Sequence, residues 1–184
     1  GTEAETVAVA EEILANEKAQ PYDRAMAALL AGSASSAIGD DAKAEAYFTR
    51  AIDENALSND NHYTAMLSLA SVYINTEDYD KGNALIERVI TETSTKNPDG
   101  YGLLGASYYN SGKYAEAVAP LKKAIELKTG EPDVQWAQML MASYAESGQD
   151  AEAVKVAEEI QRTSPDDKKA LMNLAALYGN LDMQ

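Results

Sequence analysis

The strongest constraint on the fold of this chain is that its sequence repeats itself. Residues 4–13 and 151–160 are identical at eight of ten positions. A tyrosine also recurs at nearly constant spacing, with intervals of 35, 36 and 34 residues, at Tyr73, Tyr108, Tyr144 and Tyr178. A period of roughly 20–50 residues is typical of arrays in which each unit stacks on its neighbours. The sequence therefore predicts a tandem array of units.

Each unit has the pattern of two helices, which we name the first helix and the second helix of the unit. In the third unit, Tyr101, Leu104 and Tyr108 have the i, i+3, i+7 spacing of one helix face. Gly112 follows, and glycine favours the positive φ at which helices commonly end. Pro120 lies inside a predicted second helix, so we expect a kink or a later helix start there. The other prolines fall at or just before a first helix: Pro21, Pro98, Pro132 and Pro165.

The third unit also carries the residue pattern of a known family. It reads, in order, Tyr101, Leu104, Gly105, Tyr108, Gly112, Tyr114, Ala117, Leu121 and Ala124. This order resembles the tetratricopeptide repeat, a helix–turn–helix unit of about 34 residues. The first unit fits least well, because Ser35 stands where a tyrosine is expected. The resemblance implies an all-α fold, a right-handed superhelix of about ten antiparallel helices.

Small residues in the predicted helices indicate where helices pack closely. We expect Gly32, Ala70, Gly105 and Ala175 to let the first helix of each unit lie against its second helix. Because one such unit cannot bury its apolar face alone, its stability should come from stacking on its neighbours.

The repeat pattern predicts four complete units between two half units. The complete units span residues 20–58, 59–96, 97–130 and 131–165. Residues 1–19 correspond to a second helix alone, and residues 166–184 to a first helix alone. Two explanations stay open: the half units act as caps, or the sequence is cut from a longer array. We favour the second explanation at the C-terminal end, where Leu171 and Tyr178 would otherwise lack a covering helix.

Charge and composition argue against several classes of function. The chain has 15 Lys and Arg against 30 Asp and Glu, a net charge of −15, and nucleic acids and anionic membranes both attract basic surfaces. It has no cysteine and a single histidine, which leaves no disulfide, thiolate, zinc site or histidine-based triad. We therefore expect no cofactor, no metal and no direct membrane insertion. The compartment is not encoded, although the lack of cysteine is compatible with an exported bacterial protein.

A peptide-binding groove is the candidate site that the resemblance implies. First-helix residues at i, i+3, i+7 and i+11 would line it: Leu67, Ser71, Asn75, Ala106, Asn110, Gln135, Gln138, Ala142 and Glu146. Asn75, Asn110 and Asn180 share one repeat position, and such a row of amides could bond an extended peptide backbone. The alternative is that asparagine is common in the last turn of a helix, where it assists termination.

Two further residues have a functional and a structural interpretation. His62 follows two polar residues at a predicted helix start, where a surface histidine is favoured over a catalytic base or a metal ligand. Trp136 stands beside the large-residue position of its unit, where packing between units is favoured over contact with a ligand.

The sequence thus predicts a non-enzymatic scaffold that binds a protein or peptide segment in a groove. Its partner could be basic, because the chain is strongly acidic. One alternative is a structural segment that associates end to end with further copies or with a longer array. Another is a domain that positions a substrate for a larger enzyme.

Overall fold

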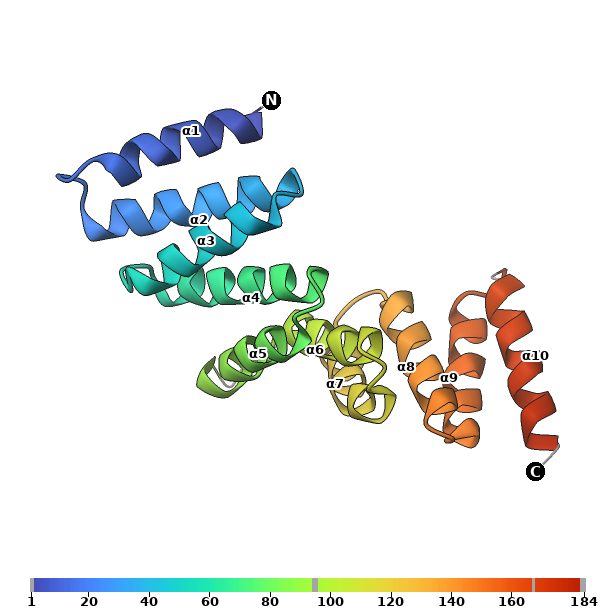
Figure 1. Ribbon diagram of the computed structural model, residues 1–184. Helices are drawn as coiled ribbons and strands as arrows, with labels where there is room; N and C mark the ends of the chain where they lie inside the picture. The colour runs from blue at the N-terminus through green and yellow to red at the C-terminus, as the bar shows by residue number, and fades with distance from the viewer. Residues whose placement is uncertain (1, 94–95, 167, 183–184) are drawn as a thin grey trace. The chain divides into compact units, whose positions relative to one another are not determined.

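The described part of the chain is entirely helical. The computed structural model describes residues 2–93, 96–166 and 168–182, which form ten α-helices and no strand (Figure 1). The predicted all-α fold is therefore confirmed. None of the described helices combines the length and the apolar character needed to cross a membrane.

The chain divides into two compact parts, each larger than one repeat. From here on we call them unit 1 (Gly1–Ser94) and unit 2 (Thr95–Gln184), and we call the two-helix units of the sequence repeats. Unit 1 contains α1 (Thr2–Ala15), α2 (Pro21–Ala37), α3 (Asp41–Asp53), α4 (Asn59–Asn75) and α5 (Tyr79–Thr93). Unit 2 contains α6 (Pro98–Asn110), α7 (Tyr114–Leu127), α8 (Val134–Glu146), α9 (Asp150–Thr163) and α10 (Lys168–Asp182). The even-numbered helices correspond to first helices of the repeat and the odd-numbered ones to second helices.

The turn that ends each first helix has the same geometry in four places. A residue with positive φ follows the helix: Gly39 (76°), Glu77 (63°), Gly112 (74°) and Gly148 (74°). The next backbone N–H donates to a carbonyl five residues earlier, as from Lys113 to Tyr108 at 2.8 Å. This bond satisfies a carbonyl that the helix end leaves without a partner. The turn at Glu77 repeats this geometry without a glycine.

Prolines and polar caps begin several of the helices. Pro21 and Pro98 occupy the first turns of α2 and α6, as predicted. The Asp133 carboxylate accepts a bond from the Trp136 backbone N–H at 3.1 Å and caps α8. The prediction of a later helix start at Pro120 is wrong, because α7 begins at Tyr114 and continues through the proline to Leu127.

Glycines bring first helices close to their second helices, as predicted. A Cβ atom at Gly32 would lie 2.7 Å from the Phe48 ring, and one at Gly105 would lie 2.5 Å from Leu121 Cγ. Such contacts leave no room for a side chain, so these two positions require glycine for the observed packing. Phe48 and Leu121 are themselves fully buried in the cores of their units.

Each helix packs against the next one in its unit, and first helices also contact each other. In unit 1, α2 contacts α4, and in unit 2, α6 contacts α8. The first helices of these two pairs of successive repeats are therefore neighbours. This arrangement decides which side chains can share a binding face.

Candidate functional site

Six of the predicted groove residues lie on two helices that contact each other in unit 2. Ala106 and Asn110 belong to α6, and the other four belong to α8: Gln135, Gln138, Ala142 and Glu146. Ala106, Gln138 and Ala142 are half-buried, whereas Asn110, Gln135 and Glu146 are exposed. The α6–α8 face therefore combines small side chains, amides and one carboxylate.

The other three predicted groove residues lie on α4 of unit 1. Leu67 and Ser71 are half-buried, and the Ser71 hydroxyl donates to the Leu67 carbonyl at 3.0 Å. Asn75 is exposed at the last position of α4, and Asn110 is likewise the last residue of α6. The helix-end interpretation of these asparagines fits this placement equally well. The Asn180 side chain lies outside the described residues.

Trp136 packs between two first helices, which agrees with the favoured interpretation. A Cβ atom at Gly102 of α6 would lie 2.4 Å from Cε2 and Cζ2 of this indole. The Lys128 ammonium lies over the same indole, 5.6 Å from the ring centroid. The indole is thus already engaged by two protein groups.

His62 has an aromatic neighbour rather than a set of metal ligands. Its ring meets the Tyr63 ring edge-on at a centroid distance of 5.9 Å. Among the described residues, no group of three or more His, Cys, Asp or Glu side chains could hold a metal ion.

An apolar hollow between α1 and α2 is a candidate site that the repeat pattern did not predict. Its volume is about 390 Å³. Val9 is 56% exposed on its wall, and Leu30 is exposed beside it. The remaining lining residues are Thr2, Glu5, Thr6, Ala10, Ile13 and Ala27. The identity between residues 4–13 and 151–160 was the signal that could have revealed it.

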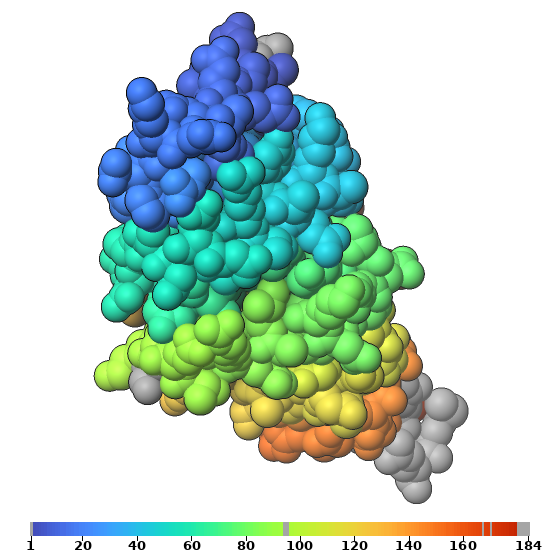
Figure 2. All heavy atoms as spheres, turned by 60° about the vertical axis from the view of Figure 1, so that its left-hand side comes forward, coloured from blue at the N-terminus to red at the C-terminus, as the bar shows by residue number. Residues whose placement is uncertain are grey.

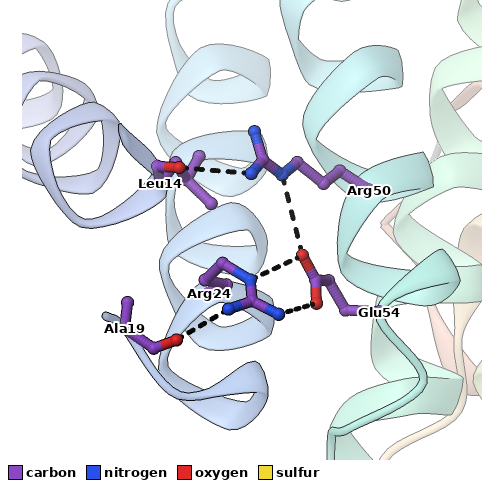
Figure 3. Close-up of polar contacts among 5 residues, drawn as sticks. All are labelled: Leu14, Ala19, Arg24, Arg50 and Glu54. Atoms are coloured by element: carbon purple, nitrogen blue, oxygen red, sulfur yellow. Dashed lines mark hydrogen bonds and ion pairs between the residues drawn. The ribbon is translucent and has the colours of Figure 1, made fainter. Parts of the chain in front are cut away.

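Polar bonds hold the C-terminal part of α1 and the α1–α2 loop in place. Arg24 of α2 donates through Nε and Nη2 to the two carboxylate oxygens of Glu54, both at 3.0 Å, and through Nη1 to the Ala19 carbonyl at 2.6 Å (Figure 3). Arg50 of α3 donates to the Leu14 carbonyl at 3.3 Å. The hydrogen bond from Arg24 holds the pKa of Glu54 below its usual value. These contacts connect α1 to the body of unit 1.

A tyrosine bond also joins α1 to α3. The Tyr47 hydroxyl donates to Glu11 at 2.6 Å, and this bond, aided by burial, raises the pKa of Tyr47 to about 12. In the space-filling view, α1 (dark blue) lies at one end of unit 1, against the blue and cyan atoms of α2 and α3 (Figure 2). The hollow thus has two walls that are fixed to each other by packing and polar bonds.

Comparison with known proteins identifies the repeat that these helix pairs form. Residues 67–132 match the tetratricopeptide repeat family. This part of the chain carries the tetratricopeptide repeat. No curated protein matches it significantly in sequence.

Solved structures of tetratricopeptide proteins have the same fold as this chain. MamA from Desulfovibrio magneticus RS-1, solved from residue 41 to its end, is 18% identical, with a TM-score of 0.75 over 91% of this chain and 89% of that chain. YrrB, described as a TPR protein with an unusual peptide-binding site, is also 18% identical, with a TM-score of 0.75 over 96% of this chain and 85% of YrrB. The C-terminal part of a repeat protein from Cytophaga hutchinsonii is 14% identical, with a TM-score of 0.79 over 98% of this chain and 67% of that chain. At these identities the likeness establishes the tetratricopeptide fold.

Proposed function

We propose that this tetratricopeptide chain is a non-enzymatic scaffold that binds an extended protein or peptide segment on its first helices. The observation that carries the proposal is the α6–α8 face, where Asn110 and Gln138 stand on two contacting helices beside Ala106 and Ala142. An amide side chain both donates and accepts hydrogen bonds, as a peptide backbone requires. The small alanines leave the amides accessible to an extended chain.

The proposal keeps the predicted repeat boundaries and extends to the first helix of the second repeat. The boundaries are 20–58, 59–96, 97–130 and 131–165. The corresponding face in unit 1 lies on α4, which contributes Leu67, Ser71 and Asn75. A basic segment is the favoured partner because of the net charge of −15. YrrB, a TPR protein with an unusual peptide-binding site, supports the same mode of action by analogy.

The test is selection of binding peptides from a displayed library, followed by titration of a labelled peptide. We expect Asn110→Ala combined with Gln138→Ala to weaken binding about tenfold, because each lost hydrogen bond leaves a peptide group unpaired. The matched control is Lys123→Ala combined with Glu126→Ala, an exposed ion pair on α7. Equal affinities for the chain and the amide variant would refute the α6–α8 site. A steep loss of affinity with added salt would identify the basic character of the peptide.

A second candidate function is self-association, which two exposed apolar surfaces favour. One is the α1–α2 hollow, with Val9 and Leu30 exposed. The other is α10, on which Leu171, Met172 and Tyr178 are exposed. Apolar surfaces of this kind commonly mark interaction sites. Sedimentation equilibrium over a wide range of concentration tests this candidate, and a single monomeric species throughout would reject it.

A further inference from the structure

The α1 and α9 helices have nearly the same sequence but different surroundings. Residues 4–13 match residues 151–160 at eight of ten positions, so Ile13 corresponds to Ile160 and Thr6 to Ala153. Ile160 and Ala153 are buried in one core with residues of α8. Ile13 and Thr6 are only half-buried and line the α1–α2 hollow. The hollow therefore lies on the helix face that α8 covers on α9.

The complementary situation occurs on α10, which corresponds to α8 at a spacing of 34 residues. Tyr144 of α8 is 6% exposed, whereas Tyr178 at the same position of α10 is 43% exposed. Ala137 of α8 is half-buried, whereas its counterpart Leu171 is 55% exposed. Leu177 of α10 is buried against α9. One side of α10 thus packs in unit 2, and no described helix covers the other side.

We propose that α10 of one copy docks into the α1–α2 hollow of a second copy and completes a composite repeat with it. In this interface α10 takes the position on α1 that α8 takes on α9. The proposal rests on the self-association candidate above and specifies its surfaces, its partner and its register. We call the exposed side of α10 the tail surface and the α1–α2 hollow the head surface. The interface is heterologous, because the tail surface of one copy meets the head surface of another.

The α8–α9 pair supplies the register of the composite repeat. A cavity of about 180 Å³ brings Val134 and Ala137 of α8 together with Glu159 and Ile160 of α9. The corresponding residues of α10 and α1 are, in the same order, Lys168, Leu171, Glu12 and Ile13. In the composite repeat, Leu171 therefore faces Ile13 of the second copy, and Lys168 faces its Glu12.

Charge is complementary between the two surfaces in this register. The α1 helix carries Glu3, Glu5, Glu11 and Glu12 and neither Lys nor Arg. The α10 helix begins with Lys168 and Lys169 and has no acidic residue in its first turn. Opposite charges at an interface favour the correct register and penalise like-with-like contacts. The head–tail pairing is therefore favoured over pairing of two heads.

The first experiment uses two exposed positions whose replacement leaves the folded core intact. Leu171→Asp removes the tail surface and Val9→Asp removes the head surface. We expect each variant alone to associate at least about tenfold more weakly than the unmodified chain, because a buried carboxylate lacks a partner. An equimolar mixture should form a 1:1 dimer and nothing larger, because one intact head and one intact tail remain. Ile38→Asp, at an exposed position directly after α2 and outside both surfaces, is the control.

Each alternative gives a different sedimentation result. Undiminished association of Leu171→Asp alone would mean head-to-head pairing, and undiminished association of Val9→Asp alone would mean tail-to-tail pairing. Either result overturns the proposal while self-association itself stands. A monomeric unmodified chain at all concentrations overturns both. Circular dichroism of each variant confirms that its helices are retained.

The second experiment tests the register through the predicted Lys168–Glu12 contact. Lys168→Glu and Glu12→Lys should each weaken association several-fold, and combining both substitutions in one chain should restore it to near the original affinity. Lys122→Glu and Glu131→Lys are controls with the same changes in net charge at exposed positions of unit 2. A double variant that associates no better than either single variant would overturn the register.

Discussion

The indole of Trp136 lies directly over Gly102, and this contact joins the first helices of two successive repeats. A Cβ atom at residue 102 would lie 2.4 Å from Cε2 and Cζ2 of the ring and 2.6 Å from Nε1. Such distances are far below van der Waals contact, so only glycine permits this approach of α6 and α8. The same contact determines how the side chains of the α6–α8 face lie relative to one another.

Replacement of Gly102 by alanine should destabilise unit 2. We expect Gly102→Ala to lower the free energy of unfolding by about 1–3 kcal/mol, because the added methyl group forces α6 and α8 apart. This loss exceeds the gain of about 1 kcal/mol that alanine gives over glycine inside a helix. Urea unfolding followed by the fluorescence of the single tryptophan reports the unit that contains it.

The matched control for this prediction is the glycine of α10. A Cβ atom at Gly179 would meet nothing within 4 Å. Gly179→Ala should therefore stabilise the chain by up to about 1 kcal/mol through helix propensity alone. Stabilisation by both substitutions would show that the Gly102–Trp136 contact does not restrict the helix spacing.

The turn at Glu77 should be improved by a glycine. Glu77 has a φ of 63° and its side chain is exposed, while the corresponding Gly112 has a φ of 74°. An L-residue in this region costs about 1–2 kcal/mol, which the greater freedom of glycine in the unfolded chain partly offsets. We expect Glu77→Gly to raise the free energy of unfolding by about 0.5–1 kcal/mol. Gly112→Ala should lower it, and a shift of both melting temperatures in one direction would contradict the argument.

Most of the fold could be predicted from the sequence because the repeat constrains it many times over. Spacing alone placed Gly32 against a second helix, and the structure packs it on Phe48. A helical repeat leaves few alternatives at such a position, since only a small residue fits where two helices cross. The turn at Glu77 was also predictable from its place in the period.

The polar bonds and the apolar hollow could not be predicted in the same way. Tyr47 bonds to Glu11 across 36 residues and Arg24 bonds to Glu54 across 30. Several surface carboxylates could have served as partners, and the repeat pattern does not choose among them. The hollow depends on which helix covers α1, and in the sequence only the comparison of residues 4–13 with residues 151–160 points to it. The α6–α8 placement of the groove residues follows from the repeat, but their binding remains a prediction.

The Arg24–Glu54 pair should make stability depend on pH in the acidic range. The pKa of Glu54 is lowered from 4.5, chiefly by the hydrogen bond from Arg24. Its contribution to stability is therefore present above pH 4.5 and is lost as the pH falls through the lower, folded-state value. Glu54→Gln should be less stable than the unmodified chain near neutral pH, and the difference should close in acid. Chemical unfolding of both proteins at several pH values measures this gap.

A suitable control for that comparison is Glu131→Gln, at an exposed position in the loop before α8. Its difference from the unmodified chain should be small and should not follow the same pH profile. A Glu54→Gln gap that stays constant into acid would mean that the ion pair does not contribute through its charge.

In the alkaline range, Tyr47 should lose its proton at a higher pH than an ordinary tyrosine does. Its pKa is raised from 10.0 to about 12, first by the hydrogen bond to Glu11 and then by burial. The stabilising contribution is complete below pH 10.0 and is lost as the pH rises through about 12. The difference in tyrosinate absorbance between the unmodified chain and Tyr47→Phe isolates this residue, and it should appear near pH 12. In a Glu11→Gln background the same difference should move toward pH 10.0, because the carboxylate is the main cause of the shift. A step near pH 10.0 in both backgrounds would mean that α1 is not held to α3 by this bond in solution.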